Sequence, residues 1–204
     1  MKRIITIGRE FGSGGRELGR RLSEKLHVAY YDQEIITEIA KRTSMSEEYV
    51  RQVSESSPVM SFPIHVRHSF YYGPNPMLQQ SLSIYSEQHK LLLELAKKSD
   101  CIIVGRCADY ILRDAQPFRV FVYADTESKL KRCMERKPED ESLSEAQMKK
   151  RMTDIDRGRA KYYEFFSEQK WGAKENYDLL VNTSGADVKT LADALCGYLQ
   201  TIFE

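Results

Sequence analysis

The sequence predicts an α/β protein in which a parallel sheet is covered by helices on both faces. Five short apolar segments alternate with longer segments whose periodicity is helical. The connections between successive strands are long enough for the crossovers that parallel pairing requires. A glycine-rich turn joins the first strand to the first helix, a junction at which α/β proteins commonly bind ligands. We therefore expect one domain over residues 1–204, with ligands at the carboxyl ends of its strands.

Each predicted element follows from a local pattern. The strands are expected at residues 2–7, 27–31, 101–104, 119–124 and 177–182. The first helix is indicated by Leu18, Leu22 and Leu26, which recur four residues apart and form one apolar face. Further helices are expected at residues 33–42, 46–56, 77–98, 127–136, 144–170 and 188–203. Ser46, two positions before Glu48, is a candidate N-cap.

The composition excludes several classes of protein. Hydrophobic residues make up 41% of the chain and charged residues 30%, which is typical of a globular protein, and the net charge is only +1. The apolar run before Gly8 is far shorter than the roughly 20 residues of a membrane-spanning helix. The cysteines form no CxxC pair and are expected to be reduced thiols. We expect a cytoplasmic protein that binds neither nucleic acid nor a membrane.

We interpret the turn GREFGSGGR, residues 8–16, as a phosphate-binding loop. Glycines allow successive N–H groups to point at one anion, and the following helix adds unpaired amides and its positive end. In the Walker A pattern G-x-x-x-x-G-K-[ST], Gly15 stands at the lysine position and Arg16 at the hydroxyl position. Arg16, or Arg20 one turn later, is a candidate for the missing charge. The expected phosphate contacts are Gly12, Ser13, Gly14, Gly15, Arg16 and Glu17.

Four segments, taken in order, resemble the cytidylate kinase-like proteins, which are relatives of the nucleoside monophosphate kinases. They are the loop at residues 7–17, the Tyr31-Asp32 pair, the run GRCADYIL at 105–112 and the DRGR run at 156–159. The likeness extends over nearly the whole chain. It implies the three-layer fold of the P-loop NTPases, with a five-stranded parallel sheet, helices on both faces and a helical lid or insertion. It also implies ATP with Mg²⁺ as donor and a small-molecule nucleotide as acceptor.

The resemblance also implies roles for single residues. Gly12 to Arg16 would hold the donor phosphates, Asp32 would face the acceptor nucleotide, and Arg106 would contact the acceptor phosphate. Arg157 and Arg159 resemble lid arginines that close over the transferred group. The catalytic candidates are therefore Arg16, Arg106, Arg157 and Arg159, with Arg151 as a further cation. The candidates on the acceptor side are Asp32, Arg106, Asp109 and Arg67.

Two further segments are expected to have roles in binding or closure. Residues 57–76 contain four of the six prolines together with Arg67, and we interpret them as an acceptor-side insertion. A dimer contact explains the same segment equally well, so a homodimer stays open. Residues 144–172 form a highly charged, lid-like helical segment. Its aromatic residues, Tyr162, Tyr163, Phe165, Phe166 and Trp171, are expected to pack it onto the core.

The sequence departs from the family pattern at three positions. The Walker lysine is absent, Val104 replaces an acidic residue before Gly105-Arg106, and Glu38 replaces an arginine after the second strand. The acceptor therefore stays open, and a non-catalytic nucleotide-binding or sensing protein is the alternative function. Glu17, Asp32 and Asp109 are the carboxylates considered for Mg²⁺, and none of them is assigned.

Overall fold

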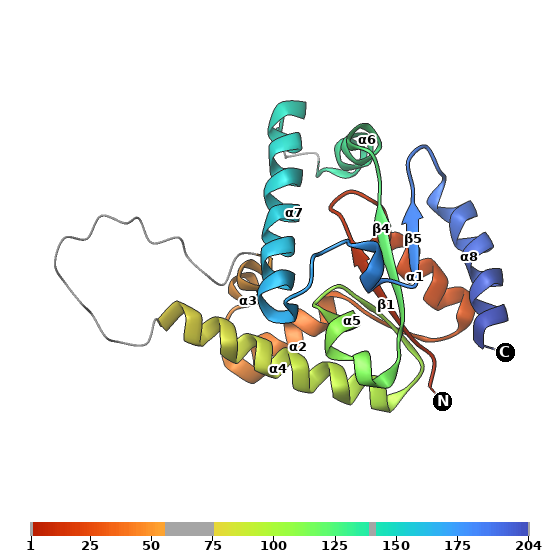
Figure 1. The fold of residues 1–204 in the computed structure, drawn as a ribbon. Coiled ribbons are helices and arrows are strands. Elements are labelled where there is room, and N and C mark those ends of the chain that lie inside the picture. The colour runs from red at the N-terminus through yellow and green to blue at the C-terminus, as the bar shows by residue number, and fades with distance from the viewer. Residues whose placement is uncertain (1, 56–75, 139–141, 204) are drawn as a thin grey trace.

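The protein folds around one sheet of five parallel strands with helices on both faces (Figure 1). The computed structural model describes residues 2–55, 76–138 and 142–203. The strands are β1 (Ile4–Arg9), β2 (Ala29–Tyr31), β3 (Cys101–Val104), β4 (Phe118–Tyr123) and β5 (Leu179–Asn182), in the spatial order β2-β3-β1-β4-β5. The predicted three-layer arrangement around a five-stranded parallel sheet is confirmed.

The central strand β1 extends further than the sequence pattern indicated. Ile7 pairs with Val104, the last residue of β3. Gly8 and Arg9 then continue the strand by pairing with β4. The strand predicted at residues 2–7 therefore ends two residues later than expected, because backbone pairing with a distant strand outweighs the local signal of Gly8. As a result, Arg9 lies at the carboxyl edge of the sheet, beyond the end of β3.

The helices are α1 (Gly15–Leu26), α2 (Gln33–Thr43), α3 (Glu47–Ser54), α4 (Pro76–Lys98), α5 (Ala108–Ile111), α6 (Thr126–Arg136), α7 (Glu145–Ser167) and α8 (Val188–Phe203). All helices except α5 agree with predicted segments to within a few residues, whereas the short α5 was not predicted. Short 3₁₀ turns occur at Arg113–Ala115 and Lys174–Asn176. Ser46 caps α3 as predicted, because its side chain accepts a hydrogen bond from the backbone N–H of Tyr49. Of the predicted insertion at 57–76, only Pro76 belongs to the described residues.

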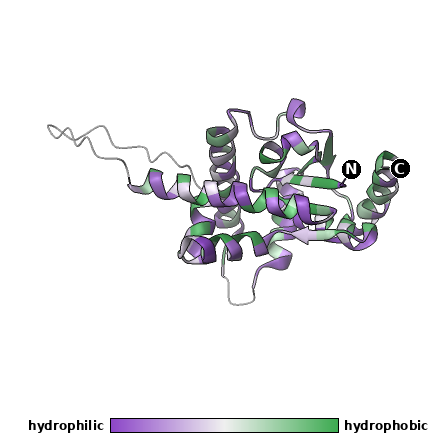
Figure 2. Cartoon of the chain, turned by 90° about the horizontal axis from the view of Figure 1, so that it is seen from below, coloured by the Kyte–Doolittle hydropathy of each residue, from purple (hydrophilic) through white to green (hydrophobic). Residues whose placement is uncertain are grey.

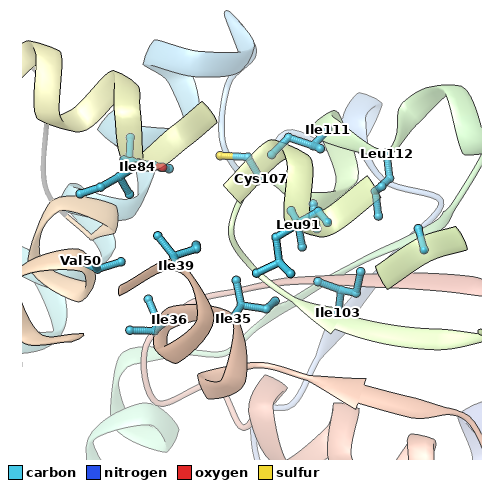
Figure 3. Packing of buried hydrophobic residues seen from close by; sticks show 14 of the residues in the cluster. Ile35, Ile36, Ile39, Val50, Ile84, Leu91, Ile103, Cys107, Ile111 and Leu112 are labelled. Carbon is cyan, nitrogen blue, oxygen red and sulfur yellow. The ribbon is translucent and has the colours of Figure 1, made fainter. Parts of the chain in front are cut away.

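The core has two parts, one on each face of the sheet. One part joins α2, α3, α4, α5 and β3, and its labelled residues in Figure 3 point toward one another. The other part is covered by α1 and α8 and includes Leu18, Leu22, Ala192 and Leu199. Hydrophobic and hydrophilic residues alternate along the helices (Figure 2), as expected for elements that bury one face. None of the described helices is long and apolar enough to span a bilayer.

The second half of α7 is fixed to the core by aromatic residues. Tyr162 and Tyr163 are buried in the first core cluster, and Phe166 stacks on Tyr85 of α4 with ring centroids 3.8 Å apart. Phe165 differs from the expectation, because it stays 39% exposed. This packing holds the charged first half of α7 over the carboxyl edge of the sheet, where the turn after β1 also lies (Figure 1).

Candidate functional site

A cavity of about 720 Å³ lies over the glycine-rich turn, bounded by residues of α1, α6 and α7. This volume is in the range of small-molecule sites. Its arginines are Arg9, Arg16, Arg20, Arg132, Arg136, Arg151 and Arg159. They outnumber the acidic lining residues Glu10, Glu17 and Asp32. The local charge therefore favours an anionic ligand, although the chain as a whole is nearly neutral.

The turn after β1 presents its backbone to this cavity. Gly12 and Gly14 have φ angles of 76° and 82°, a left-handed conformation that favours glycine. Within the described residues, the N–H groups of Gly14, Gly15 and Arg16 donate to no other backbone group. The buried hydroxyl of Thr183, the residue that follows β5, donates to the carbonyl of Ser13 at 2.7 Å and so anchors the turn. Free amides at a helix N-terminus form a binding place for phosphate.

Residues of α6 and α7 contact the same turn through hydrogen bonds and ion pairs. The Lys129 Nζ lies 2.9 Å from a Glu10 carboxylate oxygen and 3.4 Å from Asp156. Asp156 Oδ1 accepts a 2.6 Å hydrogen bond from the backbone N–H of Phe11. The Arg132 guanidinium donates to the carbonyl of Gly12 at 3.3 Å. Two helices distant in sequence therefore help to set the shape of the phosphate-binding turn.

A second, smaller cavity of about 30 Å³ lies at the carboxyl end of β3. Gly105, Arg106 and Cys107 have successive φ angles of 73°, 61° and 51°. A left-handed backbone at two consecutive non-glycine residues is strained, and such strain is concentrated at functional sites. The buried side chain of Gln88 donates to the Arg106 carbonyl at 2.8 Å and supports this turn. The Arg106 Nε is buried and has no hydrogen-bond partner in the described part of the chain.

Glu55 is the counter-ion for the guanidinium groups between the two cavities. Its Oε1 lies 3.2 Å from the Arg159 guanidinium and 4.0 Å from that of Arg106. Burial alone would raise the pKa of Glu55, but the positive charges of Arg159, Arg106 and Arg9 outweigh burial and lower it. Burial, followed by the charges of Arg159 and Arg106, lowers the pKa of Arg9 to about 9, so Arg9 keeps its charge at neutral pH. Glu55 thus faces three guanidinium groups, of which Arg9 and Arg159 also lie 3.8 Å and 3.7 Å from Asp32 and Asp156.

Comparison with known proteins identifies the family to which the chain belongs. The sequence profile of the cytidylate kinase-like family matches residues 4–185. The chain belongs to the cytidylate kinase-like family. Family membership and the three-layer fold support phosphoryl transfer by a kinase-fold protein. No curated protein sequence matches this family member.

Solved structures share its fold. An uncharacterized protein from Eubacterium ventriosum is 28% identical with a TM-score of 0.70, covering 98% of this chain and 99% of that one. Shikimate kinase from Bacteroides thetaiotaomicron is 14% identical with a TM-score of 0.59, covering 97% and 98%. Shikimate kinase from Acinetobacter baumannii, solved in complex with shikimate, is 15% identical with a TM-score of 0.55, covering 98% and 94%. At these identities the shikimate kinases show the P-loop kinase fold alone.

Within this family member, the predicted loop and strand-end residues divide between the two cavities. Asp32 is buried at the larger cavity, where its Oδ2 pairs with the Arg16 Nε at 2.6 Å and its Oδ1 lies 3.8 Å from Arg9. Glu17 also lines this cavity and bonds to Arg21 at 2.8 Å. Gly12, Gly14 and Gly15 line it as well, whereas Ser13 is buried beneath the turn. Predicted Arg67 lies outside the described residues.

Arg106 and Asp109 line the smaller cavity. Asp109 accepts a 2.7 Å hydrogen bond from the Tyr163 hydroxyl, and burial raises the pKa of Asp109. Asp109 does not occupy the N-cap position of α5, because Cys107 occupies it. Asp109 is thus held by an aromatic residue of α7, and it is separated from the larger cavity where Asp32 lies.

The predicted lid arginines of α7 point in different directions. Arg159 lines both cavities, with a side chain only 12% exposed. The Arg157 side chain is 62% exposed, lies 3.8 Å from Asp154, and is not among the residues that line either cavity in the described chain. Two positions along a helix correspond to a rotation of about 200°, which separates these two side chains. The buried Met152 and Tyr163 are in helical phase with Arg159, a signal that the sequence already contained.

Several residues of the site were missed by the sequence interpretation. They are Arg9, Glu10, Glu55, Lys129, Arg132 and Arg136. For Lys129, Arg132 and Arg136 a signal existed, because their spacing of three and four residues forms a basic stripe on a helix that follows a strand end. For Glu55 no local signal existed, since its role depends on where α3 packs.

Glu55→Gln is expected to lower the free energy of unfolding by about 2 kcal/mol at pH 7, because a buried cation cluster loses its counter-ion. The folded-state pKa of Glu55 lies below its ordinary value of 4.5. Its stabilising contribution is therefore complete above that value and is lost as the pH falls through the lower folded-state pKa. Urea denaturation at neutral and acidic pH measures the difference, which should shrink in acid. A difference of equal size at both pH values would contradict this assignment, and Glu94→Gln in a surface pair serves as control.

Proposed function

We propose that this protein transfers the γ-phosphoryl group of ATP to a small anionic acceptor, with a nucleoside monophosphate such as CMP as the first candidate. The observation that carries the proposal is the sharing of Arg9 and Arg159 by the two cavities. Phosphoryl transfer consists largely of positioning and charge stabilisation, so cations at the junction of two ligand sites suit this reaction.

The donor is proposed to occupy the larger cavity. The free amides of Gly14, Gly15 and Arg16 would bind the inner phosphates, and the α6 residues Arg132 and Arg136 would line the opposite wall. Backbone N–H groups at the positive end of α1 favour a phosphate over a neutral group. This arrangement supports nucleotide binding through the backbone, although no lysine occupies position 15.

A magnesium ion fits this site through a single protein carboxylate. Among the described residues there is no group of three or more candidate metal ligands. Mg²⁺ needs few protein ligands when nucleotide phosphates and water complete its shell. Asp32 lines the larger cavity, and its buried Oδ1 has no hydrogen-bond partner within the described residues, so this oxygen is the proposed ligand. When bound, Mg²⁺ would neutralise part of the phosphate charge.

The acceptor is proposed to approach from the smaller cavity. Arg106 is buried there with an unpaired Nε, and an acceptor phosphate or carboxylate would supply the charge that Glu55 now provides. Residues 57–76, which include Arg67, are proposed to complete the acceptor side. Residues 144–172 are proposed as a lid, since α7 carries Arg151 and Arg159 to the larger cavity. The acceptor oxygen would attack the γ-phosphorus while the bridging oxygen leaves with ADP.

With ATP and Mg²⁺, the purified protein is expected to form ADP and a phosphorylated product from at least one compound in a panel of CMP, dCMP, UMP, AMP and shikimate. The charged junction supplies the stabilisation that such a transfer needs. Product formation is measured by chromatography, and nucleotide binding by the melting temperature. If ATP raises the melting temperature but no acceptor is phosphorylated, the non-catalytic nucleotide-binding alternative is favoured. If neither ATP nor ADP shifts melting, the nucleotide function itself is rejected.

A further inference from the structure

The phosphate-binding turn differs from the Walker A pattern at two positions that touch each other in the fold. When Gly14 is taken as the second glycine of G-x-x-x-x-G-K, the first glycine position is occupied by Arg9 and the lysine position by Gly15. The chain therefore has a cation where the pattern has a glycine, and a glycine where the pattern has a cation.

The two exchanges are sterically coupled. A Cβ atom at Gly15 would lie 2.6 Å from the Arg9 Cβ, closer than side-chain carbons approach, and 3.2 Å from both the Arg9 Cγ and the Val122 Cβ. A Cβ atom at Gly105 would overlap the Arg9 guanidinium and lie 2.8 Å from its Cζ. The Arg9 side chain thus occupies the space between the turn and the end of β3. It fits only because both neighbouring positions are glycine.

The Arg9 guanidinium is charged, enclosed and weakly compensated. Its side chain is 9% exposed, and among the described residues its nearest ion-pair partner is a carboxylate oxygen of Asp32, 3.8 Å away. Asp32 is bound more closely by Arg16, at 2.6 Å. Arg9 also lines both cavities, so its charge reaches donor and acceptor sites alike. Such a cation has unused binding capacity for an anion at the junction.

We propose that Arg9 takes the place of the Walker lysine and contacts the transferred phosphoryl group, while Gly15 and Gly105 are required as glycines to admit it. This inference rests on the proposed function. In the step, the bond from the γ-phosphorus to the bridging oxygen breaks with its electron pair going to ADP. A bond forms to the acceptor oxygen, and a hydroxyl acceptor releases its proton to water. Arg9 stabilises the charge on the transferred group, whereas Arg16, with a 62% exposed side chain, binds Asp32.

The test exchanges the two residues back to the Walker pattern. The variants are Arg9→Gly, Gly15→Lys and the double variant with both changes, together with Arg9→Gln, which keeps a polar side chain but removes the charge. Turnover of ATP with Mg²⁺ and the most active acceptor, and ATP affinity by calorimetry, are measured for each. Arg9→Gly and Arg9→Gln should lose about 10²- to 10³-fold in kcat, as expected for the loss of one stabilising group. Gly15→Lys should also lose activity, because its side chain collides with Arg9.

The double variant decides the proposal. Removing the Arg9 side chain relieves the 2.6 Å contact of a lysine at position 15 and leaves the milder 3.2 Å contact with the Val122 Cβ. Activity of the double variant should therefore rise at least tenfold above both single variants. A double variant no more active than Arg9→Gly, or an Arg9→Gln variant with near-normal turnover, overturns the role of Arg9 and leaves the proposed function standing. A wild-type protein that neither binds ATP nor transfers phosphate rejects both. Circular dichroism and the melting temperature of each variant show whether it is folded.

Discussion

Arg159→Met is expected to reduce kcat of the proposed phosphoryl transfer by about 10³-fold or more, the range found for arginines that stabilise the transferred group. Arg159 lines both cavities and places its guanidinium between Glu55 and Asp156, at 3.2 Å and 3.7 Å. Methionine replaces the apolar stem of the side chain and removes the charged guanidinium. Steady-state kinetics with ATP, Mg²⁺ and the acceptor found in the panel measure the effect, which should fall on kcat more than on KM for ATP.

The same helix provides a matched control for Arg159. Arg157→Met removes an identical charge two positions away, from a side chain that is 62% exposed and near Asp154. It should leave kcat within about twofold, since exposed ion pairs contribute little. Arg159→Lys should recover only part of the activity, because lysine lacks the planar fork of donors. Equal losses for Arg157→Met and Arg159→Met would show that α7 acts through its net charge and not through this one position.

Gly12→Ala is expected to abolish the stabilisation by ATP and to lower the free energy of unfolding by about 2–5 kcal/mol, the sum of a left-handed backbone cost and overpacking. Gly12 has a φ of 76°, and an added Cβ would lie 2.7 Å from the Cys133 Sγ and 3.0 Å from the backbone oxygen of Lys129. The turn must therefore move away from α6, and its amides lose their alignment. Denaturant titration and melting with and without ATP measure the two effects.

Gly185→Ala separates the steric part of this effect from the backbone part. Gly185 also has a left-handed φ, of 64°, but an added Cβ there meets no atom of the described residues within 4 Å. It should cost only about 1–2 kcal/mol, the backbone penalty alone. If Gly12→Ala costs no more than Gly185→Ala and still responds to ATP, the close packing of the turn against α6 is not what shapes the phosphate site.

The order of strands and helices was readable from the sequence because each element is a local pattern. Apolar runs such as Cys101–Val104 and the Leu18, Leu22 and Leu26 repeat predicted elements that the structure contains. The glycine-rich turn was also readable, since left-handed backbone at Gly12 and Gly14 is a property of the residues themselves. Parallel topology then places every strand end, including Asp32 and Arg106, on one edge.

The helical phase of α7 was encoded in the sequence but was overlooked. Arg157 and Arg159 look alike in a charged segment, and the sequence interpretation treated both as lid cations. Only Arg159 shares the face of the helix that buries Met152 and Tyr163. The apolar residues of the segment carried this information, but the dense charge around them concealed it.

The sequence by itself determined the fold and the place of a phosphate-binding turn, because both depend on local patterns and on the geometry of parallel strands. The tertiary structure alone decided which charges meet there. Arg9 reaches the junction of the cavities because β1 continues its pairing with β4, and Glu55 and Lys129 join it through the packing of α3 and α6. Electrostatic interactions depend on distances of a few ångströms between residues far apart in the chain, and no local pattern encodes those distances.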